Sequence, residues 1–289
     1  MPELPEVETM RRGVALIAGS RIRGVRRPPS RLVPIQITPR LHALRRRVIG
    51  RRIESVGRLG KRIVIALDSR DRLVIEPRMT GRVLLADRGE APDREHVRLV
   101  FELDGGGRRS LDGRRLVFWD SRGLGMVWLL PPEDFARRLG PQRIGPDALG
   151  ITPDELRLRL APSRRAIKVA LLDQKALAGI GNLYASEILH RARLHPGIAC
   201  CELRPIQWRR LHAMIGEVLE EAVALQGSTL ADGTYRTARN EAGAFQGRHR
   251  VYQRAGQPCL QCRRGKIVRL VQVQRSTFYC PVCQRRRRT

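Results

Sequence analysis

The sequence is poor in aromatic residues, in lysine and, toward its C-terminus, in acidic residues. Aromatic residues make up 4% of the 289 positions, and only four of the 56 basic residues are lysine. From Ala242 onward there is no acidic residue, against 12 Lys and Arg. The formal net charge is +28. Such an excess of one sign predicts a polyanionic partner, and nucleic acid is the first candidate.

The sequence also lacks the marks of a membrane protein or an exported protein. No run of 18 apolar residues is present, so no transmembrane helix is expected. The N-terminus is polar and charged, unlike a signal peptide. An anionic membrane surface is an alternative partner for so much positive charge, but the sequence contains no basic amphipathic anchor. We therefore expect a cytoplasmic protein with no membrane partner.

Four of the six cysteines have the spacing of a zinc ribbon, C-x2-C-x17-C-x2-C. They are Cys259, Cys262, Cys280 and Cys283. Disulfide bonds are not expected in a chain without an export signal, so we predict one structural Zn2+ ion bound by these four thiolates. Cys200 and Cys201 belong to no motif, and we interpret them as small apolar residues.

The first residues combine a potential nucleophile with two carboxylates. Removal of Met1 would leave Pro2 with a free secondary amine. An N-terminal amine has a pKa of about 7.7–8.0, so part of it is neutral at pH 7 and can form an iminium with a sugar aldehyde. The apolar residues that follow recur at helical spacing, which places Glu3 and Glu6 at the positive end of a helix. The simpler interpretation is a starting methionine followed by an acidic helix cap.

Lysine is rare enough that Lys61 is a candidate for proton transfer. Lysine can release its proton near neutral pH when its surroundings shift its pKa, whereas arginine does not.

Short apolar runs between residues 63 and 130, separated by clusters of Gly, Asp and Pro, predict a β-sandwich or barrel. We assign this first domain to residues 1–140 and a turn-rich linker to 141–150. Helices dominate afterwards, so we assign a helical domain to 151–247, followed by the zinc ribbon and a basic tail at 248–289.

Within the helical domain, apolar periodicity predicts helices over 168–177, 183–191 and 207–226. The glycine-rich turn at 178–182 either exposes amide groups to a phosphate or serves only to join two helices. Residues 227–247 have little periodicity and are predicted to form a mobile loop.

Five motifs along nearly the whole chain resemble those of the bacterial formamidopyrimidine-DNA glycosylases. In order, they are Pro2-Glu3-Leu4-Pro5-Glu6-Val7-Glu8, Gly60-Lys61, Arg78-Met79-Thr80-Gly81, Gly179-Ile180-Gly181-Asn182-Leu183-Tyr184-Ala185-Ser186-Glu187 and Tyr279-Cys280-Pro281-Val282-Cys283. The resemblance implies an α+β fold with an N-terminal β-sandwich and flanking helices, a C-terminal helical helix-two-turn-helix domain and a zinc ribbon. It also implies a monomer that acts on double-stranded DNA containing a damaged base, in the bacterial cytoplasm at the nucleoid.

The same resemblance implies the chemistry. Pro2 would attack C1′ of the damaged nucleoside and form a Schiff base, with Glu3 as general acid and base. Glu6 would orient the flipped base or the nucleophile, while Lys61 would shuttle protons and hold a phosphate. Release of an oxidised purine, such as 8-oxoguanine or a formamidopyrimidine, would be followed by β- and δ-elimination, the second assisted by Arg275.

Three side chains would fill the gap left by the flipped base. They are Met79, Arg122 and Leu124. The family's D-P-R-R-F-G stretch here reads Asp120-Ser121-Arg122-Gly123-Leu124-Gly125, so a leucine stands where the family has an aromatic wedge. This departure affects lesion search and opposite-base preference more than the chemistry.

Contacts with the DNA backbone are also implied by the resemblance. Asn182 and Arg275 would clamp phosphates around the lesion. Arg164 and Lys168 would add backbone contacts, and His96 a further DNA contact, although a lone histidine on a strand is more often structural.

Two alternative functions stay open. An endonuclease VIII-like enzyme would act on oxidised pyrimidines, but such relatives usually begin with P-E-G-P-E, whereas this chain has Leu4. A DNA-binding protein without catalytic activity would need neither the Pro2 amine nor Glu3.

Overall fold

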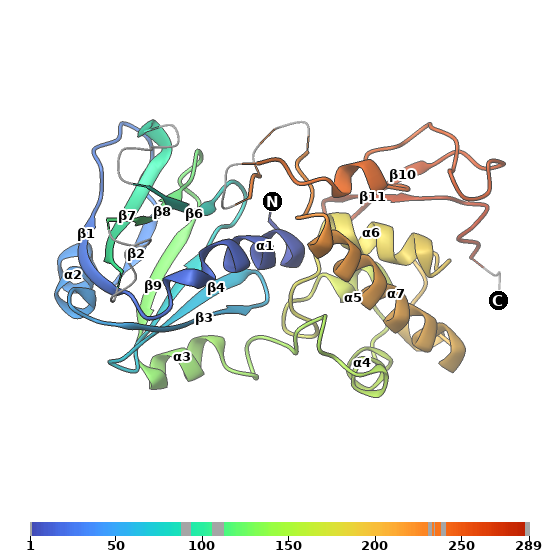
Figure 1. The fold of residues 1–289 in the computed structure, drawn as a ribbon. Coiled ribbons are helices and arrows are strands. Elements are labelled where there is room, and N and C mark those ends of the chain that lie inside the picture. Colours follow the sequence, from blue (N-terminus) through green and yellow to red (C-terminus); the bar gives the residue numbers. More distant parts are fainter. Residues whose placement is uncertain are drawn as a thin grey trace. The chain divides into compact units, whose positions relative to one another are not determined.

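The computed structural model describes residues 2–87, 94–105, 113–230, 233, 235–237 and 241–286. The chain folds into two compact units (Figure 1). The first comprises residues 1–140 and 225–246, and the second comprises residues 141–224 and 247–289.

Two sheets form the first unit. The four-stranded sheet is antiparallel and contains, in spatial order, β1 (Arg21–Arg26), β7 (Val97–Asp104), β8 (Arg115–Trp119) and β6 (Arg82–Ala86). The five-stranded sheet contains β2 (Gln36–Thr38), β9 (Met126–Leu130), β5 (Arg72–Glu76), β4 (Arg62–Leu67) and β3 (Ile53–Leu59), of which only the β2–β9 pair is parallel. Alternate residues of both sheets, among them Phe101, Phe118, Ile63 and Ile65, form one buried core. The predicted β-sandwich is confirmed.

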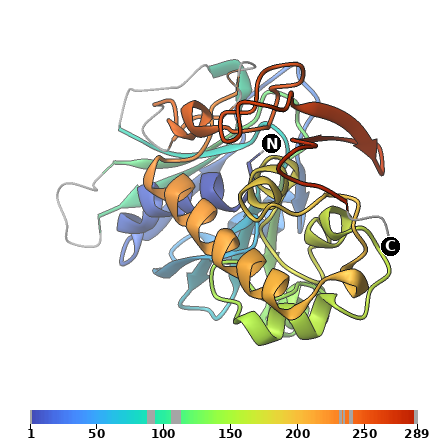
Figure 2. The ribbon, with the colours of Figure 1, turned by 90° about the vertical axis from the view of Figure 1, so that its right-hand side faces the viewer.

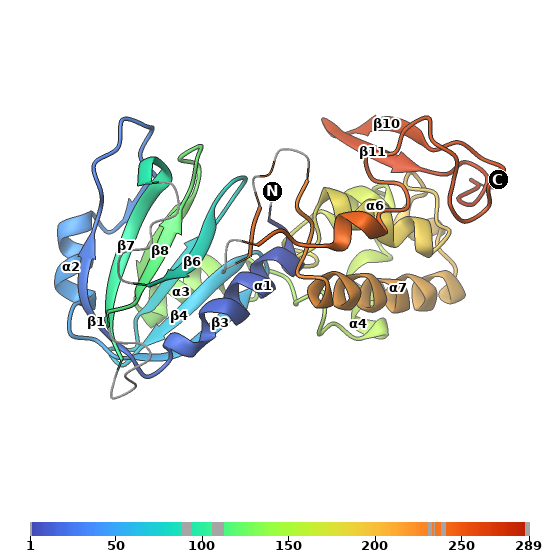
Figure 3. The same cartoon turned by 45° about the horizontal axis from the view of Figure 1, so that its top comes forward.

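Helix α1 (Leu4–Val14) packs against β6 of one sheet and against β3 and β4 of the other (Figure 3). Its apolar stripe, Val7, Met10 and Val14, is fully buried in the common core. The other helices of this unit are α2 (Leu41–Val48) and α3 (Pro132–Leu139), with 3-10 turns η1 (Ala15–Ile17) and η2 (Arg94–His96). Sequence periodicity did not predict α2, because only two residues of this arginine-rich helix, Leu44 and Val48, are buried.

The second unit is mainly helical. Its helices are α4 (Pro153–Leu160), α5 (Ile167–Leu171), α6 (Asn182–Arg191) and α7 (Pro205–Ala224), with a 3-10 turn η4 (Cys200–Glu202). A second 3-10 turn, η5 (Phe245–Arg248), leads into the ribbon strands β10 (Val268–Gln272) and β11 (Arg275–Tyr279), which pair as an antiparallel hairpin. Helix α6 packs against α7 and β11, and α4 packs against α7, the long helix coloured gold to orange in Figure 2.

One predicted helix is much shorter than expected. Helix α5 ends at Leu171, whereas the sequence pattern predicted a helix to residue 177. The reason is local side-chain bonding, which competes with the helix. The Asp173 carboxylate accepts a hydrogen bond from the Lys175 amide at 3.0 Å, and the Gln174 side chain donates to the Ile180 carbonyl at 2.9 Å.

Residues 225–246 fold with the first unit, whereas the predicted division placed 227–247 in the helical domain. Tyr235 is buried in the sandwich core, and its hydroxyl donates to the Gln226 carbonyl at 2.9 Å. Part of this predicted mobile loop, and the last three residues of the basic tail, lie outside the described residues. Within the part of the chain that is described, no helix has the length and apolarity needed to cross a bilayer.

Candidate active site and zinc centre

The N-terminal end of α1 holds the predicted nucleophile and both carboxylates. Pro2, Glu3 and Glu6 are all buried. Glu3 is the N-cap of the helix and forms a capping box with Glu6, whose Oε2 accepts the Glu3 amide at 2.9 Å. The helix N-terminus therefore fixes the position of both side chains, one and four residues after Pro2.

Glu6 also holds the segment 225–246 against α1. Its second oxygen, Oε1, accepts the Ser228 amide at 2.8 Å. Gly227 has a φ of +79°, and a Cβ there would lie 2.8 Å from the same oxygen, so only glycine fits this approach. Burial, and then the Glu6 charge, raise the pKa of Tyr235. Glu6 thus bridges the helix that begins beside Pro2 and a loop that follows α7.

Lys61 lies half-buried at the turn between β3 and β4. Arg58 ties this turn to α1: its Nε donates to Glu8 at 3.1 Å and its Nη1 donates to the Gly60 carbonyl at 3.0 Å. Burial alone would raise the pKa of Glu8. Hydrogen bonds from Arg11, Arg12 and Arg58 outweigh this effect and lower the pKa to about 2. Glu8 is therefore ionised at neutral pH and anchors the turn that carries Lys61.

The loops that carry Met79, Arg122 and Leu124 share a buried carboxylate. Asp120 is fully buried and accepts hydrogen bonds from the Thr80 hydroxyl, from the Arg122 amide at 3.1 Å and from the Gly125 amide at 2.8 Å. Met79 and Leu124 remain 40% and 45% exposed, and Arg122 is also exposed. The structure thus joins the loops that carry the three predicted gap-filling residues and leaves their side chains accessible.

His96 lies beside a cluster that the sequence did not reveal. Its ring packs edge-on against Trp119 with 5.0 Å between ring centroids. The Arg82 guanidinium lies 4.1 Å from the Trp119 ring centroid and donates to the Gly233 carbonyl at 2.9 Å. Arg82 therefore connects the sheet to the segment 225–246. No motif marks these contacts, and only the scarcity of tryptophan could have drawn attention to Trp119.

In the second unit, a buried lysine organises the predicted phosphate contacts. Lys168 is fully buried, and its Nζ donates to Asn182 Oδ1 at 2.6 Å and to the Thr277 hydroxyl at 2.7 Å. The Asn182 amide donates in turn to the Ser276 carbonyl at 2.9 Å, next to Arg275 at the start of β11. Lys168 was predicted to contact the DNA backbone directly, but in the structure its ammonium faces the protein interior and positions Asn182 and β11.

The remaining predicted contacts are simpler. Arg275 and Arg164 are both exposed, on β11 and on the connection before α5 respectively.

Cys200 is buried, which raises the pKa of its thiol to about 11, while Cys201 is exposed. Neither cysteine belongs to the metal-binding group found among the described residues.

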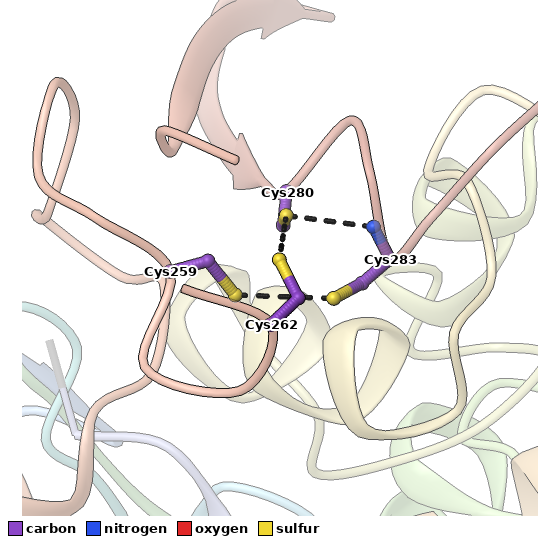
Figure 4. Close-up of side chains that lie close together, drawn as sticks. All are labelled: Cys259, Cys262, Cys280 and Cys283. Carbon is purple, nitrogen blue, oxygen red and sulfur yellow. Dashed lines mark hydrogen bonds between the residues drawn. The ribbon is translucent and has the colours of Figure 1, made fainter. Parts of the chain in front are cut away.

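The four motif cysteines come together at one end of the ribbon. Two lie in one loop, and two lie at the end of β11 and in the turn that follows (Figure 4). Their sulfur atoms all lie within 4.8 Å of one another, with Cys259 and Cys283 3.9 Å apart and Cys262 and Cys280 3.7 Å apart. Thiolates in a tetrahedral zinc site are separated by about 3.8 Å, given Zn–S bonds of about 2.3 Å. The site fits one structural Zn2+ ion.

Helix α6 supports this zinc centre. Glu187 is fully buried, and its carboxylate accepts the amides of Arg250, Val251 and Tyr252, each at 2.8–2.9 Å. One turn further along, His190 Nε2 lies 3.5 Å from Cys259 Sγ. Burial, together with nearby arginines, lowers the pKa of His190 to about 4.

Three family models match the chain in order. The Formamidopyrimidine-DNA glycosylase N-terminal domain matches residues 1–127, the Formamidopyrimidine-DNA glycosylase H2TH domain matches 140–234, and the zinc finger found in FPG and IleRS matches 256–286. The last match and the four clustered cysteines together confirm the predicted zinc site.

Relatives match along the whole length. A Formamidopyrimidine-DNA glycosylase from Chloroflexus aurantiacus is 40% identical over 285 residues, which cover 98% of each chain. The crystal structure of the MutM (Fpg) protein from Thermus thermophilus matches with a TM-score of 0.81 and 38% identity, covering 98% of each chain. A complex between Lactococcus lactis Fpg and DNA containing an abasic site matches with a TM-score of 0.84 and 29% identity, covering 98% of this chain and 100% of that one.

A β-sandwich, a helix-two-turn-helix domain and a four-cysteine zinc finger in one chain define a class of DNA glycosylases that act on damaged bases. With matching models for all three parts and 40% identity to a full-length relative, the chain belongs to the formamidopyrimidine-DNA glycosylase family.

Proposed function

We propose that this protein removes oxidised purines from double-stranded DNA and then cuts the strand at the resulting abasic site. The observation that carries the proposal is the buried N-terminal end of α1, where Pro2 is followed by Glu3 and Glu6, which form the capping box of the helix. Lactococcus lactis relatives have been crystallised with DNA containing Fapy-dG and with DNA containing an abasic site. Both ligands agree with the proposed substrate and intermediate.

The chemistry follows from an N-terminal secondary amine. The Pro2 nitrogen attacks C1′ of the damaged nucleoside, the bond from C1′ to the base breaks, and the base leaves with a proton. Glu3 protonates the ring oxygen O4′, the sugar ring opens, and an iminium joins Pro2 to C1′. This iminium makes the C2′ proton acidic, so that the 3′ phosphate leaves by β-elimination and the 5′ phosphate by δ-elimination. Lys61 shuttles protons and holds a phosphate, and Glu6 orients the nucleophile or the base.

The DNA contacts divide between the two units. Met79, Arg122 and Leu124 fill the gap left by the flipped base, with His96 as a further contact on the same unit. On the second unit, the exposed side chain of Arg275 clamps a phosphate together with Asn182, and Arg275 assists the second elimination. Arg164 adds a contact with the backbone. Action as a monomer and location in the bacterial cytoplasm at the nucleoid stay predictions.

Borohydride trapping tests this proposal. The substrate is a duplex with 8-oxoguanine opposite cytosine, and the native protein is compared with a variant that keeps one extra residue before Pro2. We expect a covalent complex with the native protein alone, because the extra residue turns the Pro2 nitrogen into an amide, which cannot form the iminium that borohydride reduces. Equal trapping by both proteins would show that another amine is the nucleophile.

The same assay separates the alternative functions. Leu124, in place of an aromatic residue, bears on lesion search and opposite-base preference, so the lesion class has to be measured directly. Faster excision from a duplex with an oxidised pyrimidine would identify an endonuclease VIII-like activity. Tight binding without excision of any lesion, and without trapping at a plain abasic site, would identify a DNA-binding protein that has lost its chemistry.

A further inference from the structure

The described part of the first unit has five large hydrophobic side chains that are substantially exposed. They are Leu16, Val33, Ile49, Met79 and Leu124. Met79 and Leu124 are the apolar members of the proposed gap-filling group. Val33 is 69% exposed, more than any of the other four. A single exposed hydrophobic side chain is common on a protein surface, so what distinguishes Val33 is what lies beside it.

Val33 lies directly against the loop that carries Leu124. Gly123 has a φ of +67°, and a Cβ built there would lie 2.2 Å from the Val33 carbonyl oxygen and 3.4 Å from the Val33 Cβ. A side chain at position 123 would therefore collide with the backbone at residue 33. Just beyond this contact, the Gln36 amide donates to the Gly125 carbonyl at 3.3 Å. The segment 33–36 thus runs alongside 123–125, and Val33 is a neighbour of Leu124.

A buried arginine holds the two segments together. Arg98 is 3% exposed, and its guanidinium donates to the Asp120 carbonyl at 2.5 Å and to the Ser121 carbonyl at 3.4 Å. The same group donates to the Ser30 hydroxyl at 3.2 Å. The base of the Leu124 loop and the segment leading to Val33 are therefore bound to one rigid group.

We propose that Val33 is a second apolar wedge, which enters the base stack beside Leu124 when a lesion is flipped out. The inference rests on the proposed function, because it places Val33, like Leu124, in the gap that the flipped base leaves in the duplex. A leucine fills less of that gap than an aromatic ring, and Val33 supplies additional apolar surface next to it. The glycine at position 123 is what allows this close approach.

Substitution of Val33 by threonine tests the proposal, because threonine keeps the shape and removes apolar surface. The matched control is Ile49→Thr, at an exposed isoleucine at the end of α2. We expect Val33→Thr to slow single-turnover excision of 8-oxoguanine opposite cytosine by about three- to tenfold, the loss expected for one apolar contact. Cleavage at a plain abasic site, where no base must be expelled, should change by less than about twofold, as should both reactions of the control.

A double-mutant cycle adds a second measurement. Leu124→Phe should restore part of the lost excision rate in the Val33→Thr background and change the native rate less, because neighbouring residues that fill one gap are not additive. Equal excision rates for Val33→Thr and Ile49→Thr, or strictly additive effects with Leu124→Phe, would overturn the proposal. If the native protein excises no damaged base at all, the proposed function itself fails, and that result is distinct from a failure of the wedge.

Discussion

The N-terminal end of α1 and the zinc ribbon both hold candidate site residues, and they are stabilised by different chemistry. At α1 the contacts are made by carboxylates: Glu6 accepts the Glu3 amide in the capping box and the Ser228 amide, while Glu8 binds Arg58. The ribbon has no acidic residue of its own, since none occurs from Ala242 onward. Its structure depends instead on four thiolates around a metal ion and on amides bound to Glu187 from α6.

This difference follows from what each region is proposed to bind. The α1 end is proposed to act on a sugar and a base, where carboxylates would serve as acid, base and orienting group. The ribbon is proposed to present Arg275 to a phosphate, and acidic side chains beside it would repel that phosphate. Zinc stabilises the hairpin without adding acidic groups to its surface. The stability of the first region should therefore depend on pH, and that of the second on metal.

Removal of zinc should have the largest effect. Binding of a structural Zn2+ ion contributes roughly 10–16 kcal/mol in small zinc domains, so a ribbon without zinc should unfold. We expect a strong chelator, or Cys283→Ser, to reduce affinity for lesion-containing DNA by at least about a hundredfold, because the phosphate contacts of the ribbon are lost. Zinc content, fluorescence anisotropy with labelled DNA and the thermal unfolding of the sandwich would be measured together.

Cys201→Ser is the matched control, since Cys201 is exposed and lies outside the metal-binding group. It should keep its zinc and its affinity. The sandwich transition should survive chelation, because its core contains no residue of the ribbon. Full DNA affinity in protein shown to be free of zinc would mean that the ribbon is not a DNA-binding element.

Glu8→Gln should have an intermediate effect that depends on pH. The folded-state pKa of Glu8, about 2, lies below its ordinary value of 4.5. The ionised carboxylate therefore stabilises the fold above pH 4.5, and this contribution is lost as the pH falls through 2. At pH 7 the variant should lose about 2 kcal/mol in the free energy of unfolding. Urea unfolding should show a similar difference at pH 7 and pH 5 and a smaller one at pH 3.

Glu54→Gln provides the control for this measurement, because Glu54 is an exposed carboxylate on β3 of the same unit. It should change stability by less than about 0.5 kcal/mol at every pH. A Glu8→Gln deficit that stays constant from pH 7 to pH 3 would show that shape, and not charge, is what Glu8 contributes.

Local sequence patterns predicted much of this molecule, because they reflect interactions between residues that are close in the sequence. The spacing of Val7, Met10 and Val14 identified α1, and the C-x2-C pairs identified the zinc site. In each case the information lies within a few residues of the feature itself.

What the sequence did not reveal depends on contacts between distant residues. Lys168 meets Thr277 across 109 positions, so a lysine expected to face DNA is instead buried. Glu8 reaches Arg58 across 50 positions, and Asp120 reaches Thr80 across 40. The segment 225–246 was grouped with the helices that precede it, because the burial of Tyr235 in another unit leaves no local pattern.

Arg275→Ala should have the smallest of these effects. The exposed guanidinium on β11 is proposed to neutralise one phosphate, so its loss should reduce affinity roughly fivefold to tenfold near 0.1 M salt. The plot of log affinity against log salt concentration should become shallower by about one unit. Anisotropy titrations at several salt concentrations on one duplex would measure both quantities.

Arg46→Ala, at an exposed position on α2, removes one positive charge from a region with no proposed DNA contact. Its salt slope should match that of the native protein, so any change seen only for Arg275→Ala reports a phosphate contact and not net charge. If both variants give the same slope as the native protein, Arg275 is not part of the phosphate clamp. The ribbon would then contribute shape to the complex, and the contrast with the carboxylate-rich end of α1 would rest on zinc alone.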